Sequence, residues 1–301
     1  MDYQRLMGVE HVAESCDGGR GVKIAILDSG TPKPAICGCS VPVSEGEVDE
    51  YGHATAVSSI LFGGWGIKGI CGNASPRYYA VLDSHGVGSV KSVAKGIYKA
   101  IDDGADIINL SLGFARSEKC PRALEDACCD AYEAGKAVIC AAGNDGGPVN
   151  WPAALKTTIS VGSSGKNGLK AAFSSVGEVD FVAPGVDLSV LCPDGRVKTV
   201  SGTSFSAALV TGVAALLLGT MRRDGTMRPD VDDIMSALRG MASDIEDPGW
   251  DSCTGYGRIS GKTSDTTVCM KIDQGFFDRI IGKIKSLIGF VYNKENNNGR
   301  V

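Results

Sequence analysis

The chain has 301 residues, of which 43% are hydrophobic and 22% are charged, and its formal net charge is −5. This length is enough for one large α/β domain, or two small ones, with a substantial buried core. The acidic balance argues against nucleic acid as a partner, because no basic excess is available to neutralise phosphates.

The 11 cysteines are scattered and odd in number, without the CxxC pair or the histidine-flanked cluster that indicates zinc. We therefore expect no metal site built on them. The segment from Met1 to Ala13 is polar and mixed, so it lacks the apolar stretch of a secretion signal. Unpaired thiols persist best in a reducing compartment, and together these features predict a cytoplasmic protein.

The first predicted strand is the apolar run from Val22 to Leu27, which ends in Asp28 before the breaker Ser29-Gly30. The loop after it contains an acidic run from Glu45 to Glu50. We interpret this run as a solvated turn, and a structural calcium site is the weaker alternative, because the run lacks the alternating oxygen ligands of a calcium loop. Asp28 is thus the acid that a buried strand delivers to one edge of a sheet.

His53 stands at the start of a segment of small and apolar residues that predicts a buried helix. The chain has only three histidines, and the other two are His11 and His85. His11 has no neighbour that suggests chemistry, and we expect His85 to lie at most on the rim of a binding site. His53 is therefore the candidate base.

Strands and helices alternate through the middle of the chain. Apolar runs predict strands at 78–82, 106–110, 137–142 and 157–161, and amphipathic spacing predicts helices at 90–103 and 122–134. This alternation predicts an α/β fold with a doubly wound, mostly parallel sheet and helices on both faces. Polar side chains that follow such strands, Asp28 and Asn144 among them, belong at the functional edge of the sheet.

The segment from Val200 to Leu217 carries Ser204 at the mouth of an apolar helix. Its hydroxyl has two interpretations. It caps the first turn of the helix, as serine often does, or it is a nucleophile held at the positive end of the helix dipole. An acid, a base and a serine in the order Asp28, His53, Ser204 favour the nucleophile.

With these motifs in this order, the sequence resembles the subtilisin-like serine proteases, the subtilase family, and in particular their intracellular type. The resemblance covers residues 20–262 and includes Ala141-Ala142-Gly143-Asn144, which matches the family's oxyanion motif. It implies that Ser204 is the nucleophile, His53 the base, Asp28 the orienting acid and Asn144 an oxyanion donor.

The resemblance also implies a groove that binds an extended peptide by backbone pairing. The matching segments are Gly86-Val87-Gly88 and Ser111-Leu112-Gly113. Asp145 is expected to line the pocket for the side chain before the scissile bond, which would favour Arg or Lys there. Trp151-Pro152 aligns with a family pair that has a cis bond.

Three departures from the family pattern stand out. Ala54 replaces the glycine that usually follows the histidine, and Ala208-Leu209 replace a Pro-His pair after the serine. No catalytic atom is lost by either change. The loop that often holds structural calcium reads Phe62-Gly63-Gly64-Trp65-Gly66, without Asn or Asp, so we do not carry that calcium site over and expect no required cofactor.

The last part of the chain has a different composition. We divide the protein into a peptidase domain, 1–265, and a C-terminal segment, 266–301, with an amphipathic helix and a polar tail. Docking of the helix on its own domain, binding of a partner protein, and adsorption to an anionic membrane all stay open. The helix covers 276–291, with an apolar face made of Phe276, Phe277, Ile280, Ile281, Ile284, Leu287, Ile288 and Val291.

The sequence therefore predicts a serine endopeptidase that hydrolyses a peptide or protein substrate through an acyl-enzyme. The alternative from another class is a pseudoprotease, a peptide-binding or scaffold protein with little turnover. Ala54 and the lack of a folding prodomain before Asp28 are the features that would support it.

Overall fold

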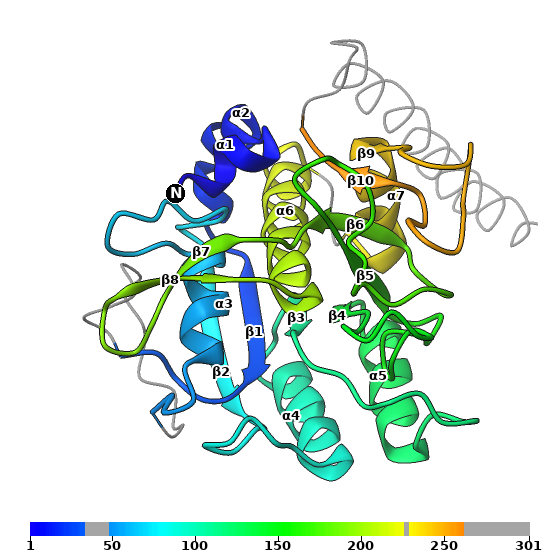
Figure 1. Ribbon diagram of the computed structural model, residues 1–301. Coiled ribbons are helices and arrows are strands. Elements are labelled where there is room, and N and C mark those ends of the chain that lie inside the picture. Colours follow the sequence, from blue (N-terminus) through cyan, green and yellow to red (C-terminus); the bar gives the residue numbers. More distant parts are fainter. Residues whose placement is uncertain (34–47, 226–228, 262–301) are drawn as a thin grey trace, which may run out of the picture. The chain divides into compact units, whose positions relative to one another are not determined.

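The computed structural model describes residues 1–33, 48–225 and 229–261 (Figure 1). The predicted boundary at residue 265 and the predicted helix at 276–291 lie outside these residues. The described part contains two sheets. The larger has eight strands in the order β2-β1-β3-β4-β5-β6-β10-β9. The smaller is a two-stranded antiparallel hairpin of β7 and β8.

The strands of the large sheet are short, and most of them are parallel. Every neighbouring pair from β2 to β10 is parallel, and only β9 pairs with β10 in the antiparallel sense. The bounds are β1 Lys23–Asp28, β2 Ser75–Ala80, β3 Ile107–Leu110, β4 Ala137–Ala141, β5 Ile159–Ser164, β6 Phe181–Pro184, β7 Leu188–Leu191, β8 Val197–Val200, β9 Ala242–Ser243 and β10 Arg258–Ile259.

Helices form two layers around the large sheet. Helices α4 and α5 contact each other and strands β1, β2 and β4, whereas α6 contacts β3 to β6 and both α3 and α7. The bounds are α1 Tyr3–Met7, α2 Glu10–Ser15, η1 Asp17–Gly19, α3 His53–Leu61, α4 Val90–Asp102, α5 Arg122–Glu133, α6 Thr203–Arg223 and α7 Val231–Met241. The predicted doubly wound α/β sheet is confirmed.

The core follows from the alternation of side chains along the strands. Ala25 and Leu27 of β1 belong to the same hydrophobic cluster as Val93 of α4 and Leu124 of α5. Successive strand residues point to opposite faces, so Ile24 and its alternates face the other helix layer. Strands covered on both faces are apolar throughout, which explains why the sequence shows continuous apolar runs rather than alternating ones.

The predicted strands differ from the observed ones by one to three residues at their ends, and two of these differences have a clear cause. The strand expected at 78–82 ends at Ala80, because the backbone N–H groups of Val81 and Leu82 both donate to the carbonyl of Asp28 and turn the chain away. The strand expected at 157–161 begins at Ile159, because the Thr158 hydroxyl donates to the Pro152 carbonyl in the preceding turn.

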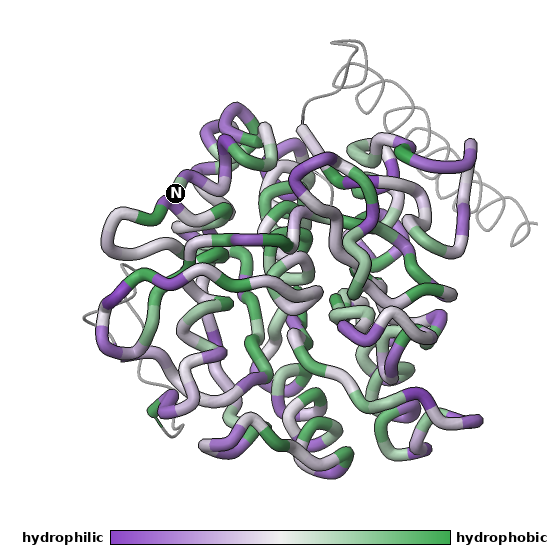
Figure 2. Tube along the Cα trace, viewed as in Figure 1, coloured by the Kyte–Doolittle hydropathy of each residue, from purple (hydrophilic) through white to green (hydrophobic). Residues whose placement is uncertain are grey.

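Helix α6 is the central helix of the domain, as its apolar sequence predicts. By length and composition it is the one helix among the described residues that could cross a membrane, but 94% of its apolar window is buried inside the protein. Hydrophobic residues concentrate along α6 and the strands beside it (Figure 2). A helix that is apolar all round and enclosed by its own domain is a core helix.

The topology brings three loops to one edge of the sheet. Strands β1 and β3 are neighbours, and β4 lies next to β3, so residues after the carboxyl ends of β1, β3 and β4 meet there. The chain winds outward in both directions from the β1–β3 pair, which is the switch point where open α/β sheets bind their ligands.

Candidate active site

Asp28 and His53 form the best-defined pair at this edge. Asp28 is the last residue of β1 and is fully buried, and both of its carboxylate oxygens lie 2.9 Å from His53 Nδ1. The Ser29 backbone N–H also donates to Asp28 Oδ1, at 2.7 Å. The carboxylate therefore fixes the ring of His53 and leaves Nε2 as the nitrogen that can accept another proton.

Ser204 lies in the first turn of α6, one residue before Phe205. The Phe205 ring is 5.7 Å from the His53 ring, centroid to centroid, so the start of α6 lies beside the histidine. The Ser204 hydroxyl donates to the Ser111 carbonyl at 2.9 Å. Because a hydroxyl has one proton, that proton is not directed at His53 here and must turn away from Ser111 before His53 can accept it.

A buried polar chain connects β3 with α6 behind the serine. The Thr211 hydroxyl donates to Asn109 Oδ1 at 3.0 Å, and Asn109 Nδ2 donates to the Ser111 hydroxyl at 2.9 Å. The Ser111 hydroxyl in turn donates to the Ser204 carbonyl at 2.8 Å. A fully satisfied buried network of this kind holds its elements in one arrangement, so the backbone of Ser204 is fixed relative to β3.

Asn144 follows β4 and points its amide toward the start of α6. Asn144 Oδ1 accepts from the Thr203 backbone N–H at 2.8 Å and from the Thr203 hydroxyl at 2.9 Å. With the oxygen engaged, Nδ2 is left as the donor, on the side of Gly202, the residue before α6. Thr203 is fully buried and was not singled out from the sequence, although it stands directly before Ser204.

The two predicted substrate segments lie at the ends of β2 and β3. Gly88 pairs with Leu82 in an antiparallel bridge, and the adjacent Asp83 N–H donates to the Val87 carbonyl at 2.9 Å. In this type of pair the N–H and C=O of Gly88 point away from Leu82, toward a strand that could be added. The Val87 N–H donates to Asp83 Oδ1, so both backbone groups of Val87 close the turn.

The second segment, Ser111-Leu112-Gly113, leads from β3 to a backbone bridge between Phe114 and Trp151. A Cβ on Gly113 would lie 3.1 Å from the Cβ of Asn150, so the side chain of Asn150 packs beneath this segment. Sequence reasoning missed Asn150, because a single asparagine before Trp151-Pro152 carries no spacing signal. The Trp151-Pro152 peptide bond is cis, as the resemblance implied.

Asp145 is exposed, next to Asn144. Its Oδ1 accepts from the Gly147 N–H and from the Ser175 hydroxyl, both at 2.9 Å. These bonds, the one from Gly147 first, lower the pKa of Asp145, so the side chain is a carboxylate held in its own turn. That Asp145 selects Arg or Lys as the substrate residue before the scissile bond stays a prediction.

The surroundings of His53 favour its charged form. Burial by itself lowers the pKa of His53, but the charge of Asp28, the hydrogen bond that His53 donates to Asp28 and the charge of Asp49 together raise it, against an opposing effect of Lys198. An imidazolium that forms at this position is therefore stabilised by its carboxylate neighbours.

The acidic run before His53 is not a solvated turn throughout. That interpretation is wrong for Asp49, which is only 2% exposed. The residues of the run up to 47 lie outside the described part of the chain. Asp49 is thus a buried carboxylate close to His53 that the sequence pattern did not reveal, because glutamates on both sides made the run look uniformly polar.

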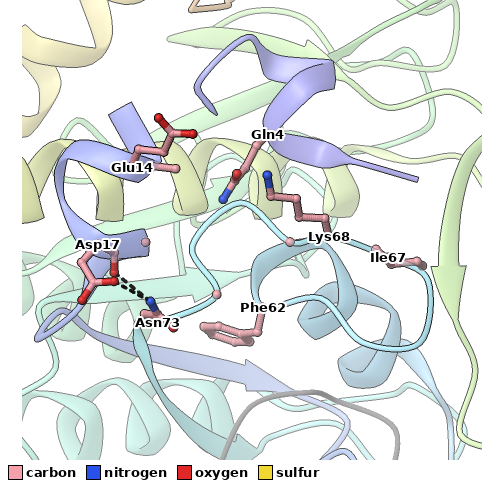
Figure 3. A pocket seen from close by; sticks show the side chains of 11 residues that line it. Gln4, Glu14, Asp17, Phe62, Ile67, Lys68 and Asn73 are labelled. Carbon is pink, nitrogen blue, oxygen red and sulfur yellow. Dashed lines mark hydrogen bonds between the residues drawn. The ribbon is translucent and has the colours of Figure 1, made fainter. Parts of the chain in front are cut away.

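A separate hollow of about 530 Å³ lies near the C-terminal end of α3, whereas His53 is at the other end (Figure 3). Its wall includes Gln4, Asp17, Lys68 and Asn73, and Asp17 is bonded to Asn73 and paired with Arg20. The loop from Phe62 to Gly66 contains no carboxylate or amide side chain, so it offers no side-chain ligand for structural calcium.

Comparisons with known proteins agree with this geometry. The subtilase family model matches residues 19–257. The chain is 33% identical to the minor extracellular protease Epr of Bacillus subtilis (strain 168) over 259 residues, which is 82% of this chain and 39% of Epr. It is 34% identical over 215 residues to subtilisin DY of Bacillus licheniformis, covering 66% of this chain and 77% of that protein.

Among solved structures, a lanthipeptide protease superposes with a TM-score of 0.76 at 26% identity, over 85% of this chain and 90% of the protease. The chain therefore spans 39% of the length of one curated relative and nearly all of a solved protease. Since the family match runs through most of the chain and the fold superposes over 85% of it, this protein belongs to the subtilase family.

Proposed function

We propose that this protein is a serine endopeptidase that works through Asp28, His53 and Ser204. The observation that carries the proposal is the Asp28–His53 pair, with both carboxylate oxygens 2.9 Å from Nδ1, next to the helix start that bears Ser204. An orienting acid, a base and a hydroxyl at the positive end of a buried helix together make an activated nucleophile.

In the proposed reaction, Ser204 rotates away from the Ser111 carbonyl and its oxygen attacks the carbonyl carbon of the scissile peptide bond. His53 Nε2 takes the hydroxyl proton as the bond to oxygen forms, and Asp28 stabilises the imidazolium. His53 then gives the proton to the departing amine, which breaks the C–N bond and leaves an acyl-enzyme. A water molecule activated by His53 hydrolyses that ester and restores the Ser204 hydroxyl.

The oxyanion of the tetrahedral intermediate would be held by Asn144 Nδ2 and by the backbone N–H of Ser204. Support comes from the two bonds that Thr203 makes to Asn144 Oδ1, at 2.8 and 2.9 Å, because they fix the amide with its nitrogen as the available donor. Donors that are already oriented need no rearrangement when charge develops, so they stabilise the transition state more than the substrate.

The substrate would bind as an extended strand between the two groove segments. Gly88 presents backbone groups outward from its bridge with Leu82, and Leu112 and Gly113 lead out of β3 on the other side. An added strand gains its affinity from main-chain hydrogen bonds and its selectivity from alternate side chains. A peptide or protein chain is therefore the proposed substrate class.

Cytoplasmic placement remains a proposal. In support of it, the eight cysteines in the described part of the chain are all unpaired. Most of them are buried, and burial raises the pKa of the Cys71 and Cys128 thiols, so they behave as apolar core residues.

The test compares the native protein with Ser204→Ala and with Ser15→Ala, a control at an exposed serine on α2. We expect a fluorophosphonate probe to label the native protein and the control, and both to hydrolyse a peptide substrate. Ser204→Ala should do neither while keeping its fold. Labelling or turnover by folded Ser204→Ala would overturn the assignment, and a folded native protein without labelling would favour the peptide-binding alternative.

A further inference from the structure

Asp49 is a buried carboxylate that the reaction scheme above does not use. It is 2% exposed, and a carboxylate in that position is costly unless donors surround it. Four donors do. Asp49 Oδ1 accepts from the Ser29 hydroxyl at 2.8 Å and the Gly52 N–H at 2.7 Å, and Oδ2 accepts from the N–H and hydroxyl of Thr55 at 2.7 and 2.5 Å.

These donors lie on both sides of His53 in the sequence. Gly52 directly precedes the histidine and Thr55 is in the first turn of α3, where N–H groups have no partner within the helix. Gly52 has no side chain with which to cap α3, so Asp49 takes that place from outside the helix. A negative charge at this end also complements the helix dipole. The backbone that carries His53 is thus held by Asp49.

Ser29 connects Asp49 to the acid of the triad. The Ser29 hydroxyl lies 2.8 Å from Asp49 Oδ1 and 3.1 Å from Asp28 Oδ1, and it accepts from the Ala54 N–H at 3.0 Å. One hydroxyl proton is therefore shared between two buried carboxylates. Ser29 thus links the two buried aspartates through one hydroxyl, next to the ring of His53.

We propose that Asp49 is a positioning residue of the peptidase reaction, which holds the first turn of α3 so that His53 faces Ser204 and adds a second buried negative charge beside the imidazolium. The proposal rests on the proposed function, since it assigns His53 the role of base. Within the described residues, the charged groups that shift the pKa of His53 are Asp28 from β1, Asp49 from the loop before α3, and Lys198 from β8.

The charge of Asp49 acts in the direction that the proposal requires. After burial, which lowers the pKa of His53, and after Asp28, which raises it, Asp49 is the next contributor that raises it, whereas Lys198 opposes. Removing the Asp49 charge should therefore let the pKa of His53 fall. Since the base must be neutral to accept a proton, the acid limb of kcat/KM should then move to lower pH.

The experiment uses Asp49→Asn, which keeps the size and one acceptor oxygen and removes the charge. We expect kcat to fall about tenfold with little change in KM, equivalent to about 1.4 kcal/mol of transition-state stabilisation. The acid limb of kcat/KM should shift to lower pH. Glu50→Gln is the matched control, because Glu50 is the exposed acid next to Asp49. This control should leave kcat, KM and the acid limb of kcat/KM unchanged.

Thr55→Val separates hydrogen bonding from charge. It removes the hydroxyl donor at 2.5 Å and leaves Asp49 charged, so kcat should fall with the acid limb unmoved. If Asp49→Asn fails to fold, as its thermal midpoint would show, this variant decides, and an unchanged kcat would overturn the proposal. A native acid limb in folded Asp49→Asn overturns it as well. Either failure leaves fluorophosphonate labelling of Ser204 intact, whereas absent labelling of the native protein would refute the proposed function itself.

Discussion

At the scale of single residues, the proposed oxyanion side of the site depends on how Asn144 is held. Thr203 donates twice to Asn144 Oδ1, and its own hydroxyl accepts from the Gly143 N–H at 3.2 Å. A buried threonine at the start of α6, in contact with the loop after β4, thus sets the direction of the amide. The side chain that does this is neither acid nor base, so no catalytic pattern in the sequence identifies it.

Asn144→Ala tests this arrangement. We expect kcat to fall by about 10²–10³ with little change in KM, the loss known for the corresponding amide in subtilisin itself. The physical reason is that Nδ2 meets charge only in the transition state. Asn167→Ala, at an exposed asparagine whose Oδ1 accepts from Leu169, is the control and should be neutral. A change confined to KM would instead place Asn144 in substrate binding.

At the scale of elements, the turn after β4 is shaped by a glycine that no other residue can replace easily. Gly143 has φ of +123°, and a Cβ there would lie 2.6 Å from the Ser175 hydroxyl and 2.8 Å from Asn150 Nδ2. Both a strained backbone and a steric clash therefore oppose any side chain. The turn carries Asn144, so its geometry sets the position of the proposed oxyanion donor.

Gly143→Ala should lower both the thermal midpoint and kcat. Gly135→Ala is the matched control, because Gly135 has φ of +72° and no atom within 4 Å of the added methyl. The control should show only the backbone cost of about 1 kcal/mol. Gly143→Ala should cost about 1–3 kcal/mol more, since Ser175 and Asn150 must move. Equal losses of stability in the two variants would show that contacts of the added methyl with Ser175 and Asn150 do not destabilise the turn.

Much of this arrangement could be predicted because it follows from local patterns. Buried parallel strands of four to six residues give apolar runs that are easy to recognise; Asp28 ends one of them, and Asn144 comes shortly after another. The strands β9 and β10 have two residues each, too few to show any period. Their pairing is visible only in three dimensions.

The burial of Asp49 could not be predicted for a related reason. Its donors come from Ser29, 20 positions earlier in the chain, and from Gly52 and Thr55 at the start of α3. The sequence of an acidic run does not indicate that one of its carboxylates is buried. The direction of the Ser204 hydroxyl toward Ser111, 93 positions away, is equally a product of packing rather than of motif.

At the scale of the whole molecule, one acidic residue outside the active site links pH to global stability. Asp180 lies in the loop before β6, where Oδ2 accepts from the Ser160 N–H at 2.9 Å and the main-chain carbonyl accepts from the Tyr256 N–H at 2.7 Å. Burial raises the pKa of Asp180 to about 6, against the lowering effects of the Ser160 N–H and of Arg239. The ionised form is therefore disfavoured in the folded protein.

The sign of the pH dependence follows from the raised pKa. In the unfolded chain an aspartate ionises near pH 4, so between about pH 4 and pH 6 the unfolded state loses its proton first and the folded state loses stability. Above about pH 6 the full penalty applies, which for a rise of about two pKa units is at most about 3 kcal/mol. Below about pH 4 the group is protonated in both states and the penalty disappears.

Asp180→Asn removes the charge and keeps an oxygen that can accept from Ser160. In a Ser204→Ala background, which prevents self-digestion, we expect it to raise the thermal midpoint at pH 8 by several degrees, at about 2–4 °C per kcal/mol. The gain should shrink toward pH 4. Asp194→Asn is the control, because hydrogen bonds to Arg196 lower the pKa of this exposed group, and it should give no gain at either pH. A gain of equal size at pH 4 and pH 8 would mean that packing, and not the buried charge of Asp180, limits stability.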